Sequence, residues 1–234
     1  MTGDSTGTIT TIPANDNQKA LIEKLVQTFR ICKDIRCVYN TYAEIQKLYD
    51  DIEKEPSYAS IMLGLDHSMN DFIVLNWAKL FGNYSEDLHV TNLFQELASP
   101  YNIAKQFFLN KMNITEGEYG NMHRELLNSR NYYAAHFDSI NCYGISNRTQ
   151  FFSKIPLQAD ALIELLISEL HCNPAINNLS FPFCYSQEDI TSVQLASFIE
   201  EKYQEVQMLT NETFSNFLAY LANGIHDKSI ASKD

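Results

Sequence analysis

Long stretches of this sequence place apolar residues three and four positions apart, and this spacing constrains the fold more than any other feature. Such spacing forms one side of an amphipathic α-helix, whereas a half-buried strand would alternate strictly. Glycine and proline, which interrupt helices, number only 8 and 6 in 234 residues. With 45% hydrophobic residues, the chain can bury one sizeable core. We therefore predict an all-α protein with a single domain over residues 15–234 and a disordered polar tail over residues 1–14.

Turn residues and capping patterns divide the chain into helices joined by short polar connections. Thr115 and Glu118 form a capping-box pattern, and the "SQED" stretch that ends at Asp189 provides another. The expected helices cover residues 16–53 (one helix, or two joined near Cys32 to Arg36), 57–81, 91–111 (bent at Ser99-Pro100), 115–136, 155–170 and 189–221. Short connections favour antiparallel neighbours. We predict an up-and-down helical bundle with an additional long C-terminal helix.

Charge and cysteine usage exclude several classes of protein. The formal charge of -12 argues against broad nonspecific binding to nucleic acid, because phosphate contacts require Lys and Arg. The five cysteines contain no CxxC pair, so neither a disulfide framework nor a zinc ribbon is indicated. No signal peptide and no stretch of about 18 uncharged apolar residues is present. These features predict a cytoplasmic protein without a membrane span.

Established catalytic motifs are missing from the sequence. It has no HExxH, no GxSxG, no glycine-rich phosphate loop and no dinucleotide fingerprint. His171 and Cys172 are adjacent, but only the distant Cys184 could add a third ligand. We expect neither a metal nor a cofactor.

The stretch "RELLNSRNYYAAHFDSI", residues 124–140, places polar residues in an otherwise apolar helical pattern. On a helical wheel at about 100° per residue, Arg130 and His136 flank the apolar stripe on opposite sides, about 120° apart. The rise between them is about 9 Å. They cannot converge on one atom within a single straight helix. Convergence requires the helix to fray near Ala134 and Ala135, or a second copy of the same helix alongside, which predicts a homodimer.

These residue types suit cleavage of a phosphodiester. An imidazole can give or take a proton near neutral pH, and a guanidinium matches phosphate oxygens. In RNA the 2′-hydroxyl is a built-in nucleophile, so His136 as acid or base and Arg130 at the charged phosphorane would suffice without metal. Asn131 could add a hydrogen bond to phosphate or to the imidazole. The surrounding cations Arg124, Arg148 and Lys154 are the expected substrate-binding residues.

Arg130-Asn131 followed by four residues and His136 resembles the R-x(4 to 6)-H motif of HEPN domains, and "SRNYYAAHFD" is similar to the form found in abortive-infection proteins. The upstream "DFIVLNWAKLFGN" is also similar to preceding helices of that group. The resemblance covers about residues 20–170. It implies a dimeric helical bundle with juxtaposed motif helices and metal-independent endoribonuclease activity, often as the toxin of a toxin-antitoxin or phage-defence system. RNA, a second copy and an antitoxin protein are the implied partners.

A second interpretation of the same residues remains open. An arginine at the edge of a core is often paired with a carboxylate, and a lone histidine on a helix is often a satisfied structural residue. On this interpretation the chain is a catalytically inactive interaction module, in which Arg130 and His136 brace a dimer or a partner.

Overall fold

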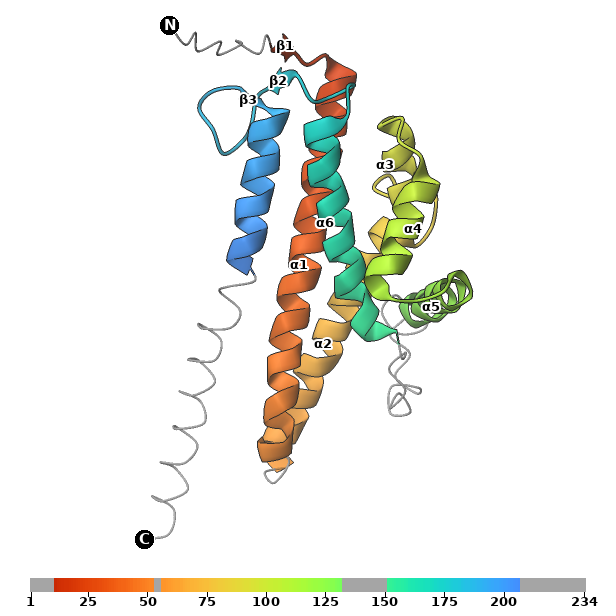
Figure 1. The fold of residues 1–234 in the computed structure, drawn as a ribbon. Coiled ribbons are helices and arrows are strands. Elements are labelled where there is room, and N and C mark those ends of the chain that lie inside the picture. The colour runs from red at the N-terminus through yellow and green to blue at the C-terminus, as the bar shows by residue number, and fades with distance from the viewer. Residues whose placement is uncertain (1–10, 53–55, 132–150, 207–234) are drawn as a thin grey trace, which may run out of the picture.

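The computed structural model describes residues 11–52, 56–131 and 151–206, and it is almost entirely helical (Figure 1). In chain order the elements are β1 (Ile12–Pro13), α1 (Asp16–Ile52), α2 (Pro56–Phe81), α3 (Val90–Glu96), α4 (Tyr101–Met112), α5 (Glu116–Ser129), η3 (Phe152–Lys154), α6 (Ile155–Cys172), β2 (Leu179–Phe181) and β3 (Ile190–Thr191). A further helix covers residues 192–206. The predicted all-α class is confirmed.

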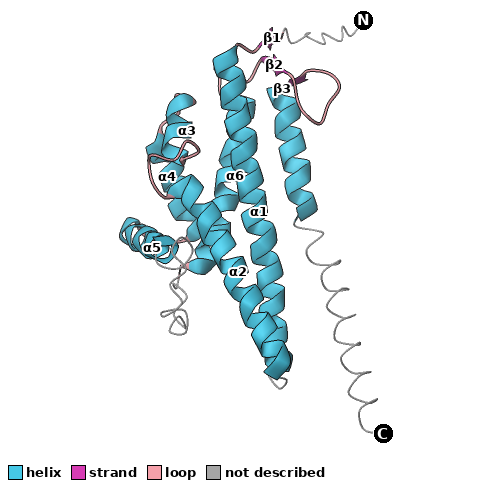
Figure 2. Ribbon diagram, turned by 180° about the vertical axis from the view of Figure 1, so that it is seen from behind, coloured by secondary structure: helices cyan, strands magenta, loops and turns pink. Residues whose placement is uncertain are grey.

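The helices form a bundle around α1 and α6, and the 18-residue α6 lies beside the amino-terminal part of the 37-residue α1 (Figures 1 and 2). α2 packs on α1, and α4 packs on the other side of α6. α5 lies crosswise beyond the carboxyl end of α4 and contacts α2. None of the described helices is long and apolar enough to cross a membrane.

α1 is one uninterrupted helix of 37 residues, which decides between the two alternatives left open by the sequence. Cys32 and Ile35, at the proposed joint, are both 0% exposed, so the apolar side of the helix continues through this region. The helix begins with a reciprocal cap: the Asn15 amide oxygen accepts from the Gln18 backbone N–H, and Gln18 Oε1 accepts from the Asn15 backbone N–H, both at 3.0 Å.

The region 91–111 contains two helices rather than one bent helix. α3 ends near Leu97, and Ala98 has a φ of 53° in the left-handed region. Pro100 then precedes α4 and has an extended backbone. Because proline restricts the residue before it and a left-handed residue cannot continue a helix, the chain turns sharply between the two segments.

The Thr115–Glu118 capping box is confirmed. Thr115 Oγ1 accepts from the Glu118 backbone N–H at 3.2 Å, and Glu118 Oε2 accepts from the Thr115 backbone N–H at 2.7 Å. Two orphan donors of the first turn are thereby satisfied. The predicted extension of this helix to His136 lies outside the described residues beyond Asn131.

The predicted start of the last helix at Asp189 is wrong. Ile190 and Thr191 instead form β3, which pairs antiparallel with β2. The helix starts after them, and its cap is Thr191, whose Oγ1 accepts from the Gln194 backbone N–H at 3.2 Å. Ile190 and Thr191 are therefore paired in a sheet, and they do not form the first helical turn that the "SQED" pattern predicted. The part of this helix predicted beyond residue 206 lies outside the described residues.

The predicted disordered tail over residues 1–14 is also wrong at its end. Ile12 and Pro13 form β1, which pairs parallel with β2, and the Ala14 backbone N–H donates to Ser180 O at 2.9 Å. Ala14 itself is buried. The partner strand lies more than 160 residues away along the chain, so local sequence carried no sign of the pairing. Residues 1–10 lie outside the described part of the chain.

Candidate functional site

The helix that carries the motif is anchored by its apolar stripe. Met122 and Leu126 of α5 are both 0% exposed, and Tyr119 packs against the same core. Met122 and Leu126 are four residues apart and therefore lie on one side of the helix, which is its apolar stripe. The stripe holds α5 against the bundle, and it determines which side of the helix reaches solvent.

A buried chain of hydrogen bonds fixes α5 to α2 and α6. The Trp77 indole N–H donates to Gln158 Oε1 at 2.9 Å, and Gln158 Nε2 donates to the Tyr119 hydroxyl at 3.0 Å. Gln158 is 0% exposed. Burial raises the pKa of the Tyr119 phenol well above its usual value, so it stays neutral. Three helices are thus joined through one side-chain amide, which apolar spacing could not reveal.

His123 makes a second attachment of α5 to the carboxyl end of α2. Its Nε2 lies 2.7 Å from Phe81 O and 3.2 Å from Gly82 O, a geometry in which the ring nitrogen donates to carbonyl oxygen. The ring also contacts Trp77 edge to face, with centroids 5.6 Å apart. No motif or spacing distinguishes His123 from the other five histidines of the sequence.

Arg130 and Asn131 follow directly after Ser129, the last residue of α5, and Arg130 is the C-cap of that helix. The Arg130 backbone N–H donates to Leu126 O and Leu127 O, so the residue is still in the last turn. Its side chain is half-buried at the edge of the stripe, as the wheel predicted, and Asn131 is exposed. Within the described residues the guanidinium has no carboxylate or carbonyl partner. His136 lies outside the described residues, so its distance from Arg130 remains a prediction.

Of the three residues expected to bind substrate, two lie in the described part of the chain, and these two make different contacts. Arg124 is exposed and donates to the neutral Asn121 Oδ1 at 2.7 Å, and no carboxylate among the described residues forms an ion pair with it. Lys154 is half-buried and donates to Met112 O at 2.8 Å, where it caps the carboxyl end of α4. Lys154 is therefore engaged in holding the fold, and substrate binding is not its evident role. Arg148 lies outside the described residues.

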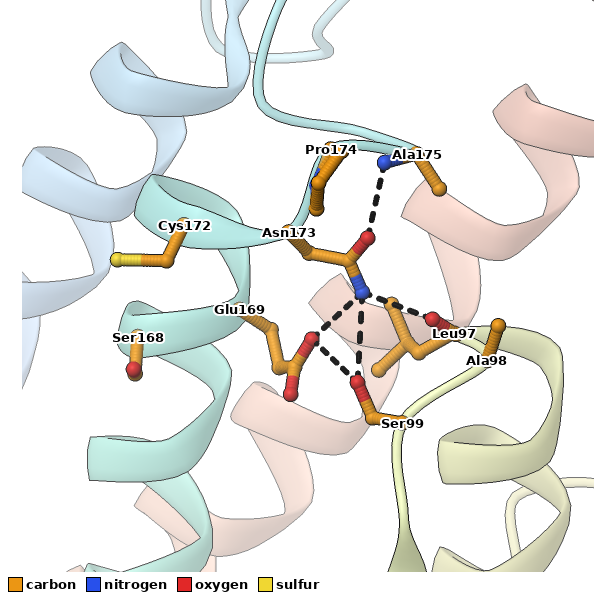
Figure 3. A pocket seen from close by; sticks show the side chains of 9 residues that line it. All are labelled: Leu97, Ala98, Ser99, Ser168, Glu169, Cys172, Asn173, Pro174 and Ala175. Atoms are coloured by element: carbon orange, nitrogen blue, oxygen red, sulfur yellow. Dashed lines mark hydrogen bonds between the residues drawn. The ribbon is translucent and has the colours of Figure 1, made fainter.

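A second site, which the sequence did not indicate, is a pocket of about 470 Å³ where the α3–α4 turn meets the end of α6 (Figure 3). Its residues come from the α3–α4 turn and from the end of α6 with the loop after it: Leu97, Ala98, Ser99, Ser168, Glu169, Cys172, Asn173, Pro174 and Ala175. Three of these side chains converge in the close view. Glu169 Oε2 accepts from Asn173 Nδ2 at 2.6 Å and from Ser99 Oγ at 2.8 Å.

Asn173 links the two sides of this pocket. Its Nδ2 also donates to Leu97 O at 2.8 Å, and its Oδ1 accepts from the Ala175 backbone N–H at 2.9 Å. The only sequence signal for this arrangement was the Asn-Pro pair that follows α6. Its partners at Leu97 and Ser99 lie more than 70 residues earlier, and they come close only when the α3–α4 turn packs against the end of α6.

The described residues contain no group of three or more His, Cys, Asp or Glu side chains placed to hold a metal ion. Comparison of the chain with protein-family models, with characterised proteins and with solved structures gave no match.

Proposed function

We propose that this chain is a metal-independent endoribonuclease of HEPN type, with a composite active site formed by two copies. One observation supports this proposal above the others. The end of a firmly anchored helix presents Arg130 at the margin of the core without a carboxylate partner among the described residues, and exposes Asn131 beside it. A structural arginine at such a margin would be expected to pair with an acidic side chain.

The proposed reaction breaks an RNA strand by an intramolecular transesterification at phosphorus. The 2′-oxygen attacks the adjacent phosphorus, the bond to the 5′-oxygen breaks, and the products are a 2′,3′-cyclic phosphate and a 5′-hydroxyl. His136 transfers a proton, as base at the 2′-hydroxyl or as acid at the leaving oxygen. Arg130 stabilises the negative charge of the phosphorane, and Asn131 donates a hydrogen bond to it.

The remaining parts of the proposal concern partners. A homodimer would bring Arg130 of one copy near His136 of the other, since a single straight helix separates them by about 120° around its axis. Arg124, with no ion-pair partner among the described residues, would attract the RNA backbone. We further propose a cytoplasmic toxin, in a toxin-antitoxin or phage-defence setting, that is held inactive by an antitoxin protein.

One observation favours a noncatalytic interaction module instead. α2 exposes Leu65, Phe72 and Leu75, with exposed fractions of 42%, 40% and 36%. Together with the exposed Ser68 and Lys79, they follow a spacing of three and four residues, which is the contact pattern of one helix against another. A helical seam that no described segment of the chain covers suits a protein whose function is to bind a partner helix.

Purified protein incubated with total RNA in the presence of a chelator distinguishes the two functions. For the nuclease, we expect cleavage that leaves cyclic-phosphate ends and that falls by at least about 100-fold in His136→Ala, the scale of a lost general acid or base. His171→Ala is the matched control, because His171 is exposed on α6 away from the motif, and it should cleave as the wild type does.

The result that would overturn the nuclease proposal is specific. Intact RNA with folded wild-type protein, or equal cleavage by wild type and His136→Ala, removes His136 and the proposed mechanism. If Arg130→Ala then only lowers the melting temperature, the interaction module is the remaining function. A mixture of His136→Ala and Arg130→Ala chains tests the composite site, since one complete site can form in a heterodimer and should restore activity.

A further inference from the structure

We infer that the pocket between the α3–α4 turn and the end of α6 binds a primary ammonium group on a short alkyl chain. This site lies on other elements than the Arg130 motif, and the inference does not depend on the nuclease proposal. Its volume of about 470 Å³ falls within the range of small-molecule sites. None of its lining residues is Lys, Arg or His.

The charge of the pocket favours a cation. Glu169 provides a carboxylate, and the hydrogen bonds that it receives come from the neutral donors Ser99 and Asn173. No described cation pairs with it. The pocket also lies at the carboxyl end of α6, an 18-residue helix, where the helix dipole adds partial negative charge. A carboxylate without a cation, beside the negative end of a helix, attracts a positive ligand.

The hydrogen-bonding groups match an ammonium more closely than a planar guanidinium. Both bonds from Ser99 and Asn173 go to Glu169 Oε2, so Oε1 remains available as an acceptor, and Figure 3 shows it without a dashed line. Ser99 Oγ donates to Glu169 and also accepts from Asn173 Nδ2 at 3.4 Å, so both of its roles within this cluster are already filled. One free carboxylate oxygen suits the compact charge of an –NH₃⁺ group, whereas the planar fork of a guanidinium needs two acceptors side by side.

The rest of the lining suits a short aliphatic chain. Ala98, Pro174 and Ala175 contribute small apolar surfaces on the side formed by the two turns. Ala98 is held in its left-handed conformation by the end of α3, and Asn173 ties the two turns together. The walls are therefore fixed before a ligand arrives, which lowers the cost of ordering on binding.

The probe is 1,4-diaminobutane, titrated into the ¹⁵N-labelled full chain at constant ionic strength and followed by amide chemical shifts. We expect saturable shifts at Ser99, Glu169 and Ala175. Glu169→Gln should weaken the affinity by about tenfold or more, because a charge-assisted bond is lost while the acceptor for Ser99 and Asn173 is kept. Ser168→Leu, which adds bulk at the exposed edge of the pocket, provides an independent test and should also abolish the shifts.

Two controls separate a site from general attraction to an acidic chain. Glu164→Gln removes the same charge from the same helix, at a residue that pairs with Lys111 outside the pocket, and should leave the affinity unchanged. The neutral analogue 1,4-butanediol should cause no saturable shifts. Equal weakening by Glu164→Gln and Glu169→Gln, equal shifts with the diol, or no saturation by the diamine would each overturn the inference.

Discussion

Gln158 is the residue whose loss should most clearly loosen the helix that carries the proposed site. Its amide accepts from Trp77 of α2 and donates to Tyr119 of α5 in a fully buried position. Gln158→Met keeps an unbranched side chain of similar length and removes both hydrogen bonds. The perturbation is therefore to hydrogen bonding, with little change in packing.

The expected cost follows from what each partner loses. The Trp77 indole N–H is left without an acceptor in the core, which costs about 1–3 kcal/mol, and the lost bonds add about 0.5–1.5 kcal/mol. Tyr119 loses one donor to its hydroxyl oxygen. We expect Gln158→Met to lower the free energy of unfolding by about 2–4 kcal/mol.

Urea unfolding followed by circular dichroism measures this loss. Hydrogen exchange locates it: amides of α5 should lose protection, whereas those in the middle of α1 should not. Gln106→Met is the matched control, because Gln106 is exposed and bonds only to Asn110 within α4, and it should change stability by less than about 0.5 kcal/mol.

A double-mutant cycle with Trp77→Phe isolates the bond itself. The Trp77→Phe change should cost less in the Gln158→Met background than in the wild type, with a coupling of about 1–2 kcal/mol. A coupling near zero, or a Gln158→Met protein as stable as the wild type, would refute the view that this amide holds the three helices together.

Two further predictions concern the turn after α2. A Cβ at Gly82 would press into the Ala78 backbone oxygen, whereas a Cβ at Gly64 meets nothing within 4 Å. Gly82→Ala should therefore lower the free energy of unfolding in urea by about 1–3 kcal/mol. Gly64→Ala should raise it by about 0.5–1 kcal/mol. Burial lowers the pKa of His89, whose Nδ1 accepts from the Thr91 backbone N–H at 3.2 Å and so must be unprotonated. Above a pH of about 6.5 the neutral His89 makes its full contribution to the stability of the fold. This contribution is lost as the pH falls toward the lowered pKa, because the unfolded chain binds the proton first. His89→Asn keeps an N-cap and should flatten the loss between about pH 7 and 5; an unchanged pH dependence would contradict this role of His89.

Local patterns predicted most of the helices because the forces that start and stop a helix act within one turn. Thr115 with Glu118 marked the start of α5, and Pro156 stands in the first turn of α6, where proline is favoured. The predictions failed where residues distant in sequence intervened. β2 pairs with Ile12–Pro13 and with Ile190–Thr191 in a small sheet. This pairing explains why the predictions of a disordered tail up to residue 14 and of a helix start at Asp189 failed.

The candidate sites also combine features that local sequence predicted with contacts between distant residues that it did not. The wheel placed Arg130 at the edge of the stripe correctly, because Met122 and Leu126 on the same helix are fully buried. The charge count could not show that Lys154 is tied to Met112 O, since that contact joins η3 to the end of α4. The nuclease chemistry itself stays a prediction, because His136 lies outside the described residues.

The sequence alone determined that this chain is helical, where most of its helices begin, and which side of α5 faces the core, because these depend on spacing and capping within one element. Only the tertiary structure decided that Gln158 joins three helices and that Glu169, Asn173 and Ser99 meet in a pocket. These contacts join residues far apart in the chain, and their polar groups are satisfied only by partners that folding brings within hydrogen-bond distance.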